Sequence, residues 1–78
     1  MVRDGFRSAG ATMVQKVIEV VGKSTDGFAK AAANAVETAA NTVRKLKSFR
    51  VTELEGTVNG QKIAEYTATV RIYFEVES

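Results

Sequence analysis

Only one stretch of this 78-residue sequence carries apolar residues at helical spacing. From Gly27 to about Leu46 the apolar residues recur at intervals of three and four, which predicts one long amphipathic helix; they are Phe28, Ala32, Ala35, Val36, Ala39, Val43 and Leu46. The segments on either side have β-type patterns, so this single helix must serve the whole sheet. One helix covers only one face of a sheet, and apolar residues on the other face then need another partner.

Both ends of this helix have sequence signals. Ser24 or Thr25 is predicted to cap the free amides of the first turn, and Asp26 would lie at the positive end of the helix dipole. Arg44 and Lys45 are predicted to lie at its negative end. The interior of the segment is rich in alanine, so a sheet could approach the helix closely and wrap around it.

The residues before the helix favour a strand. Residues from Met13 to Val21 are rich in β-branched side chains and end at Gly22, which predicts a strand with apolar residues on both faces. Residues 1–12 have no periodicity and are predicted to be an irregular N-terminal arm or leader. Residues 13–78 are then predicted to be the only domain.

Two further strands are predicted after the helix. Residues 48–58 alternate imperfectly, which indicates either a β-bulge near Thr52 or protein contacts on both faces. Asn59 and Gly60 form a hairpin signal that requires positive φ at both turn positions. The last strand alternates strictly and sends one face to the core, with the residues Tyr66, Ala68, Val70, Ile72, Phe74 and Val76.

The predicted fold class is therefore α+β, with β-α-β-β order and a three-stranded antiparallel sheet wrapped around one long helix. A chain this short buries only roughly 60% of its unfolded surface, and small domains need a further source of stability. Because the chain has no Cys and no His, disulfides and zinc sites are excluded and self-association is expected. The back of the sheet is predicted to meet another copy, through Val17 or Val14, Leu54 or Phe49, and Tyr73.

Composition excludes several functions. A net charge of +2 is too small for a nucleic-acid-binding protein, and no apolar stretch is long enough to span a membrane. We therefore expect no nucleic acid or membrane partner and a cytoplasmic location. Without Cys or His, only Glu, Asp, Lys or Tyr could transfer protons, so we do not expect an enzyme.

Two groups of charged residues are candidate sites. Lys45, Lys47 and Arg50 form a basic cluster at the helix-to-strand junction that could bind a phosphate group; the alternative is a solvated helix end. Glu53 and Glu55 lie two residues apart on one strand face, roughly 7 Å from each other. Copies of these carboxylates could converge on Ca²⁺ or Mg²⁺, and the alternative is an edge kept soluble by charge.

The segments VQKVIEVVGKSTDGF, AAANAVETAANTV, FRVTELEGTV and YTATVRIYFEVE together resemble the dodecin family, from about Val14 to Glu77. This resemblance implies a homo-oligomer of twelve copies that closes into a hollow shell. It also implies binding of flavins such as riboflavin or FMN, and in some members of coenzyme A. The family's flavin-stacking tryptophan aligns with Ser48, and its hydrogen-bonding glutamine aligns with Thr67. Both positions depart from the family pattern.

Two functions follow from the resemblance. The first is a non-catalytic oligomeric shell that sequesters small molecules or ions, with weak or absent flavin binding, as in family members that lack the tryptophan and are associated with calcium. The alternative is a flavin-storage protein that uses a relocated aromatic, Phe49 or Tyr73. Phe49 is next to the stacking position, but a shift of one residue turns a strand side chain to the opposite face.

Overall fold

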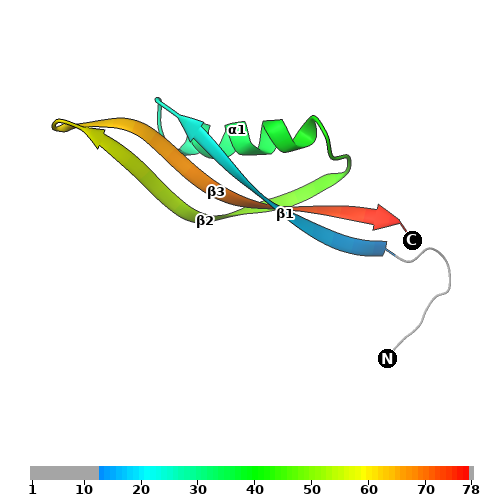
Figure 1. The fold of residues 1–78 in the computed structure, drawn as a ribbon. Helices are drawn as coiled ribbons and strands as arrows, with labels where there is room; N and C mark the ends of the chain where they lie inside the picture. The colour runs from blue at the N-terminus through cyan, green and yellow to red at the C-terminus, as the bar shows by residue number, and fades with distance from the viewer. Residues whose placement is uncertain (1–12, 78) are drawn as a thin grey trace.

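The computed structural model describes residues 13–77, so the predicted N-terminal arm, residues 1–12, lies outside the described residues. The element order is β1 (Met13–Ser24), α1 (Phe28–Ala40), β2 (Leu46–Asn59) and β3 (Lys62–Glu77). The central strand of the sheet is β3, which is antiparallel to β1 on one side and to β2 on the other (Figure 1). The predicted β-α-β-β fold, with a three-stranded antiparallel sheet and one helix, is confirmed.

The core is a thin contact between α1 and the sheet. The buried side chains of α1 are Ala31, Ala35 and Ala39, which fall at every fourth position, and they pack on three residues of β3, Ala68, Val70 and Ile72. Alternate residues of β3 share a face, so these three and the direct partners of Val70 and Ile72 on β1, Val20 and Ile18, lie on the helix side. Small side chains on α1 therefore bring the helix backbone close to the sheet.

Gly22 lies where β1 passes closest to α1. A Cβ atom placed on Gly22 would lie 2.0 Å from the carbonyl oxygen of Ala31 and 2.9 Å from the Cβ of Ala35. The sequence predicts that the strand stops before this glycine, but β1 continues to Ser24. That prediction is wrong because the glycine is needed for the close approach of helix and strand rather than for a chain reversal.

The helix is shorter than predicted. It ends at Ala40, with Asn41 as C-cap, and the amides of Thr42 and Val43 both donate to the carbonyl oxygen of Ala39. Lys45 then adopts a left-handed conformation with φ of 62°, and Leu46 begins β2. The chain therefore turns into β2 over residues that the periodicity assigned to the helix.

Because the helix is shorter, the basic residues predicted for its C-terminal end lie outside it. No basic residue lies in the last helical turn, so Arg44 and Lys45 follow the helix instead of forming its end. The helix start also differs, because Gly27 is the N-cap and no side chain caps it. Ser24 is still part of β1, and its hydroxyl oxygen accepts a hydrogen bond from the Asp26 amide at 2.9 Å, closing the turn that precedes the helix.

Two side-chain contacts attach the first half of α1 to the sheet. The Phe28 ring packs edge-to-face on the Tyr66 ring, with centroids 4.9 Å apart, a favoured arrangement for aromatic pairs. The Nδ2 of Asn34 donates to the carbonyl oxygen of Lys23 at 2.8 Å. These contacts supplement an interface in which the helix contributes mostly methyl groups.

The bulge in β2 is confirmed. The register with β3 shifts between Val51 and Glu53, and the hydroxyl of Thr52 donates to the carbonyl oxygen of Thr69 at 3.3 Å. Because of this extra residue, Val51 and Leu54 both lie on the helix side although they are three residues apart: their partners are Val70 and Ala68. The imperfect alternation of residues 48–58 is thus explained by a bulge near Thr52.

The hairpin between β2 and β3 turns one residue later than predicted. Asn59 still pairs with Lys62, and the turn residues are Gly60 and Gln61. Gly60 has φ of 68°. Gln61 does not have positive φ, because Lys45 is the only non-glycine residue of the described range that does. Positive φ at the first turn position alone matches a type II′ turn with glycine there, so Asn59 itself needs no left-handed backbone.

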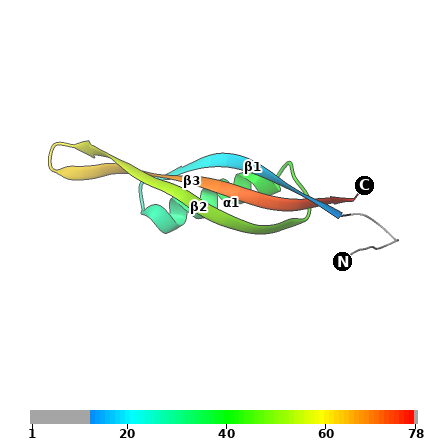
Figure 2. The same ribbon diagram turned by 90° about the horizontal axis from the view of Figure 1, so that it is seen from below.

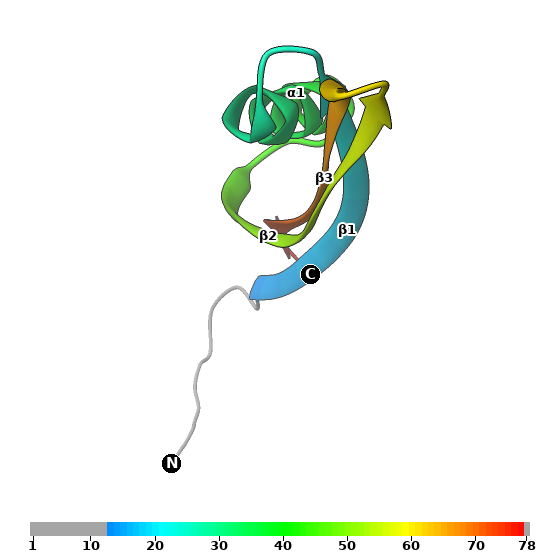
Figure 3. The same ribbon diagram turned by 90° about the vertical axis from the view of Figure 1, so that its left-hand side faces the viewer.

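Apolar surface stays open on the helix side of β2. α1 packs mainly on β1 and β3, and Figure 3 shows the helix on the concave side of the curved sheet. Phe49 is 55% exposed and Leu54 is 54% exposed, although their partners Ile72 and Ala68 are buried. Phe49 and Leu54 therefore do not lie on the back of the sheet, as one prediction had it; the bulge places both on the helix side, where the offset helix leaves them exposed.

The β2–β3 hairpin extends beyond the rest of the fold. β1 ends at the pair Ser24–Tyr66, and residues 57–65 continue as a two-stranded hairpin arm whose tip projects past α1 (Figure 2). On this arm, Val58 is 68% exposed and its partner Ile63 is 55% exposed. Isolated two-stranded hairpins are only marginally stable in water.

In residues 13–77, no helix has the length and apolar character needed to cross a membrane.

Candidate ligand-binding face

The side of the sheet away from α1, called here the outer face, holds the two positions aligned with the family's ligand residues. Ser48 on β2 is directly opposite Tyr73 on β3. Directly opposed residues of an antiparallel pair lie on the same face, with Cβ atoms about 4.5–5.5 Å apart. The tyrosine ring is half-buried and the serine is exposed. An aromatic side chain therefore occupies the neighbouring strand in the same row as Ser48.

Phe49 lies on the opposite side of the sheet. Its partner is the buried Ile72, and together with α1 it lines an open hollow of about 500 Å³. The helix residues along this hollow are Ala29, Ala32, Ala33, Val36 and Glu37. Of the two aromatic side chains considered as replacements for the stacking residue, only Tyr73 shares the face of Ser48.

Thr67 also lies on the outer face but far from this row. It is paired with Lys23 on β1 and Glu55 on β2. Thr67 and Tyr73 are six residues apart along β3, which corresponds to about 20 Å at about 3.3 Å per residue. That separation exceeds the length of a fused three-ring system. A flat ring on Tyr73 therefore cannot also reach Thr67 of the same chain.

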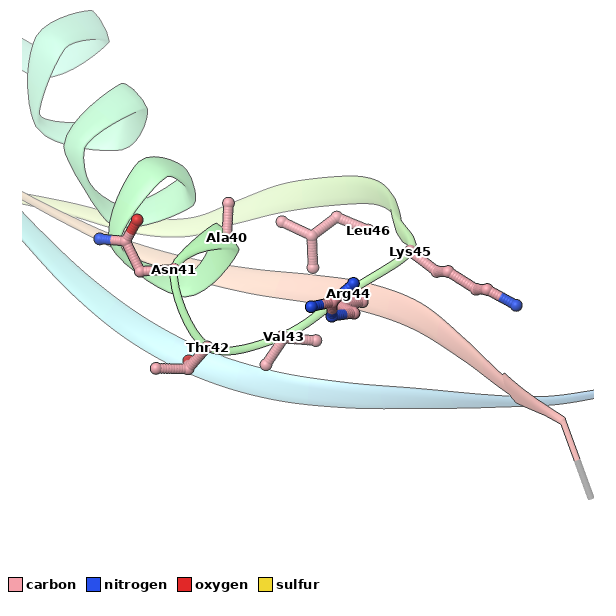
Figure 4. Close-up of a pocket in the computed structure, with 7 residues that line it drawn as sticks. All are labelled: Ala40, Asn41, Thr42, Val43, Arg44, Lys45 and Leu46. Atoms are coloured by element: carbon pink, nitrogen blue, oxygen red, sulfur yellow. The ribbon is translucent and has the colours of Figure 1, made fainter.

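The three residues of the predicted basic cluster lie on the loop after α1 and on β2. Lys45 lies in the loop of residues 41–45. Residues 40–46 line an open pocket of about 640 Å³, and the Lys45 side chain extends away from the other lining residues (Figure 4). Lys47 approaches Glu75, with 3.8 Å between Nζ and Oε1. Arg50 lies on the outer face opposite Arg71. The three cations thus have different neighbours in the structure.

Arg71 is a candidate residue that the sequence did not suggest. It stands alone between Val70 and Ile72 in the sequence, and only the strand register brings it opposite Arg50. Its Nε lies 3.9 Å from Oε2 of Glu19, its partner on β1. The bulge at Thr52 sets this register, and the sequence indicates the bulge without fixing the pairing beyond it.

Glu53 and Glu55 lie on the outer face of β2, opposite Thr69 and Thr67. Both side chains are exposed. Within residues 13–77 no group of three acidic side chains is close enough to hold a metal ion. A cation site made from these two residues would need carboxylates from a second copy.

The architecture defines a class: small α+β proteins in which one helix packs on a three-stranded antiparallel sheet with an open outer face. The sequence profile of the family described as Dodecin matches residues 14–77. A dodecin from Thermus thermophilus is 34% identical over 64 residues, which is 82% of this chain and 93% of that protein. The chain belongs to the dodecin family.

Solved dodecin structures have the same fold. An arginine-to-alanine mutant of the T. thermophilus dodecin superimposes with a TM-score of 0.81 at 33% identity and covers 86% of this chain and all of that one. The dodecin from Streptomyces coelicolor gives 0.80 at 36% identity, with coverage of 85% and 94%. A calcium dodecin from Mycobacterium tuberculosis, described as calcium-chelating, gives 0.69 at 34% identity, with coverage of 78% and 87%. Dodecins are a family of non-catalytic proteins that bind small molecules, and the homologues are oligomeric.

Proposed function

We propose that this protein is a non-catalytic oligomer that sequesters a planar aromatic ligand of the flavin type, with lower affinity than a dodecin that carries the stacking tryptophan. The observation that supports this proposal is the row formed by Ser48 and Tyr73 on the outer face. The aligned serine has no ring, but its cross-strand partner offers one at the same level of the sheet. Tyr73 is thus our proposed platform, in preference to Phe49.

The lower affinity follows from the stacking area. Stacking of a base on an aromatic side chain contributes roughly 1–3 kcal/mol, and about 1.4 kcal/mol corresponds to a factor of ten in affinity. A phenol ring offers less surface than an indole, and it starts from a different strand. Part of the stacking energy is therefore retained, and we propose weak flavin binding rather than tight storage.

Two copies must contribute to one site if the aligned positions act together. Thr67 and Tyr73 are separated by about 20 Å along β3, so one ring that contacts both needs them from different chains. Ser48 is opposite Tyr73 and has the same separation from Thr67. The site we propose is therefore complete only in the oligomer, with Tyr73 from one copy and Thr67 from another.

The open apolar surfaces support self-association. Exposed apolar side chains lie beside α1, on the outer face and on the hairpin arm, and they include Phe49, Leu54, Val17, Val21, Val58 and Ile63. Contiguous apolar patches on soluble proteins usually mark interaction sites. We propose the dodecamer of the family, whose mass would be about 101 kDa for twelve chains of 8.4 kDa.

Riboflavin fluorescence tests the ligand. Added protein is expected to quench it gradually, toward an end point of at most one flavin per chain, whereas a sharp stoichiometric end point at micromolar protein would indicate tight storage instead. Tyr73→Leu is expected to weaken binding by about tenfold or more, because it removes the ring, and Tyr73→Trp is expected to strengthen it. Phe49→Leu is the matched control, because it removes an aromatic ring from the other side of the sheet.

Three results would decide against parts of this proposal. Loss of quenching in Phe49→Leu and not in Tyr73→Leu would move the platform to the helix side. Absence of quenching by the unchanged protein would reject flavin as the ligand. A stable mass near 8.4 kDa in light scattering would reject the oligomer.

A calcium-binding role is the second candidate. It is favoured by the pair Glu53 and Glu55 on one exposed face and by the similarity to the calcium dodecin of M. tuberculosis. Copies related by symmetry would bring further carboxylates to the ion.

Coenzyme A binding and a cytoplasmic location stay predictions from the sequence.

A further inference from the structure

One row of the outer face has an excess of positive charge. Across the sheet it reads Glu19 on β1, Arg71 on β3 and Arg50 on β2, because Arg71 is the direct partner of both other residues. The row thus contains two guanidinium groups and one carboxylate. Like charges directly opposite each other on an antiparallel pair are destabilising, so a bound anion would relieve the repulsion between Arg50 and Arg71.

The carboxylate in the row compensates only in part. Arg71 Nε and Glu19 Oε2 are 3.9 Å apart, and both side chains are more than half exposed, which makes the ion pair weak. Within residues 13–77 the structure shows no ion pair for Arg50. The nearest acidic residue on β2, Glu53, is opposite Thr69, on the side of the row away from Tyr73. On the Tyr73 side, the next outer-face carboxylate of β3 is Glu75, which Lys47 approaches at 3.8 Å, and no ion pair within residues 13–77 joins Glu75 to either arginine.

The charged row is the neighbour of the proposed platform. Arg71 and Tyr73 are two residues apart on one strand face, which places their rows about 7 Å from each other. A ring stacked on Tyr73 would bring a substituent on a short chain within reach of both guanidinium groups. Guanidinium groups match phosphate oxygens with paired, charge-assisted hydrogen bonds.

We infer that Arg50 and Arg71 form a phosphate-recognition site, so that the chain prefers a planar ring that carries a phosphate monoester to the same ring without it. This inference rests on the proposed flavin-type ligand. It differs from the basic cluster predicted from the sequence, because Lys45 extends from the loop after α1 and Lys47 approaches Glu75. Only Arg50 of that cluster contributes, and its partner is a residue far away in the sequence.

Flavin mononucleotide and riboflavin test this inference, because they differ by one phosphate monoester. The ratio of their dissociation constants is measured by fluorescence quenching at low ionic strength, with the full-length protein. We expect flavin mononucleotide to bind about tenfold more tightly, which equals about 1.4 kcal/mol, and this ratio should fall when the salt concentration is raised. Arg50→Gln should reduce it to about threefold or less.

Lys62→Gln is the matched control, because it removes one positive charge from the hairpin arm, away from the row. It should keep the tenfold ratio, whereas inorganic phosphate should compete with flavin mononucleotide and not with riboflavin. Equal affinity for the two flavins, or equal loss in Arg50→Gln and Lys62→Gln, would overturn the phosphate site and leave the proposed function intact. Absence of quenching by either flavin would reject both proposals.

Discussion

Gly22→Ala tests the close contact between helix and sheet on which the fold depends. The added Cβ would lie 2.0 Å from the carbonyl oxygen of Ala31 and 2.8 Å from the amide nitrogen of Ala35. Ordinary contact begins at 3.4 Å, so the first of these distances is about 1.4 Å too short. Both obstacles are backbone atoms of α1, and no flexible side chain can move aside. The helix must therefore move away from β1 as a unit.

The magnitude follows from two opposing effects. Overpacking a tightly packed core costs about 1–3 kcal/mol and sometimes more, and the clash with backbone puts Gly22→Ala at the upper end. Replacing glycine lowers the entropy of the unfolded chain, which returns about 0.4–1 kcal/mol. The net loss is then about 2 kcal/mol. In a domain of this size one kcal/mol shifts Tm by about 4–8 °C, so we expect a decrease on the order of 10 °C.

Thermal unfolding followed by circular dichroism measures this shift, at one fixed protein concentration because assembly makes Tm depend on concentration. Gly56→Ala is the matched control on β2. A Cβ on Gly56 would meet the carbonyl oxygen of Glu65 at 3.3 Å and a methyl carbon of Ile63 at 3.9 Å, and a shift of a few tenths of an ångström would accommodate it. If both variants unfolded within about 2 °C of the unchanged protein, which is less than the shift for one kcal/mol, the close approach of α1 to β1 would be refuted.

Three further predictions concern the hairpin arm and the acidic pair. Val58→Asp should lower the mass seen in light scattering, because it places a charge on the open apolar arm, whereas Gln61→Asp in the adjacent turn should leave the mass unchanged; equal masses for all three proteins would exclude the arm from the interface. Gly60→Ala should cost about 1 kcal/mol because of the positive φ at that position, and Gly60→Asn should cost less; equal Tm values for the two variants would contradict the turn geometry. If calcium is the ligand, isothermal titration should detect binding that Glu53→Gln combined with Glu55→Gln abolishes, and heat that persists in the double variant would place the ion elsewhere.

The order and type of the elements could be predicted because each has a strong local pattern. The strict alternation from Tyr66 to Val76 predicts the helix side of β3 correctly, and Ala68, Val70 and Ile72 are buried there. The broken alternation around Thr52 predicts the bulge. These features depend on side-chain direction over a few neighbouring residues, which the sequence displays directly.

Element ends were harder to predict because tertiary contacts decide them. Gly22 has the appearance of a strand end, yet it lies inside β1 where the helix backbone approaches. Val43 and Leu46 continue the helical spacing, but no glycine or proline follows Ala40 to signal the end of the helix. Leu46 instead pairs with Phe74 as the first residue of β2. The pairing of β2 with β3 overrides the local periodicity.

The candidate site depends on the register between β2 and β3. Sequence patterns do not fix this register, so they could not identify Tyr73 and Arg71 as the neighbours of Ser48 and Arg50. Placing Phe49 and Ser48 on opposite faces requires only the period of a strand, and the structure places them so. Placing Tyr73 beside Ser48, or Arg71 beside Arg50, requires the pairing of β2 with β3. Three register shifts interrupt that pairing, and each one changes which residues face each other.

The alanine surface of α1 links folding, assembly and ligand binding. Small side chains let the helix lie close to β1 and β3, but the two largest fully buried side chains are then only Ile72 and Val70. Burial in one chain is correspondingly small, while β2 and the hairpin arm keep apolar residues open to a second copy. A domain of this size with such a core gains much of its stability from association. The bulge that turns Leu54 to the open helix side also sets the row in which Ser48 meets Tyr73, so surfaces for assembly and for the ligand follow from one register.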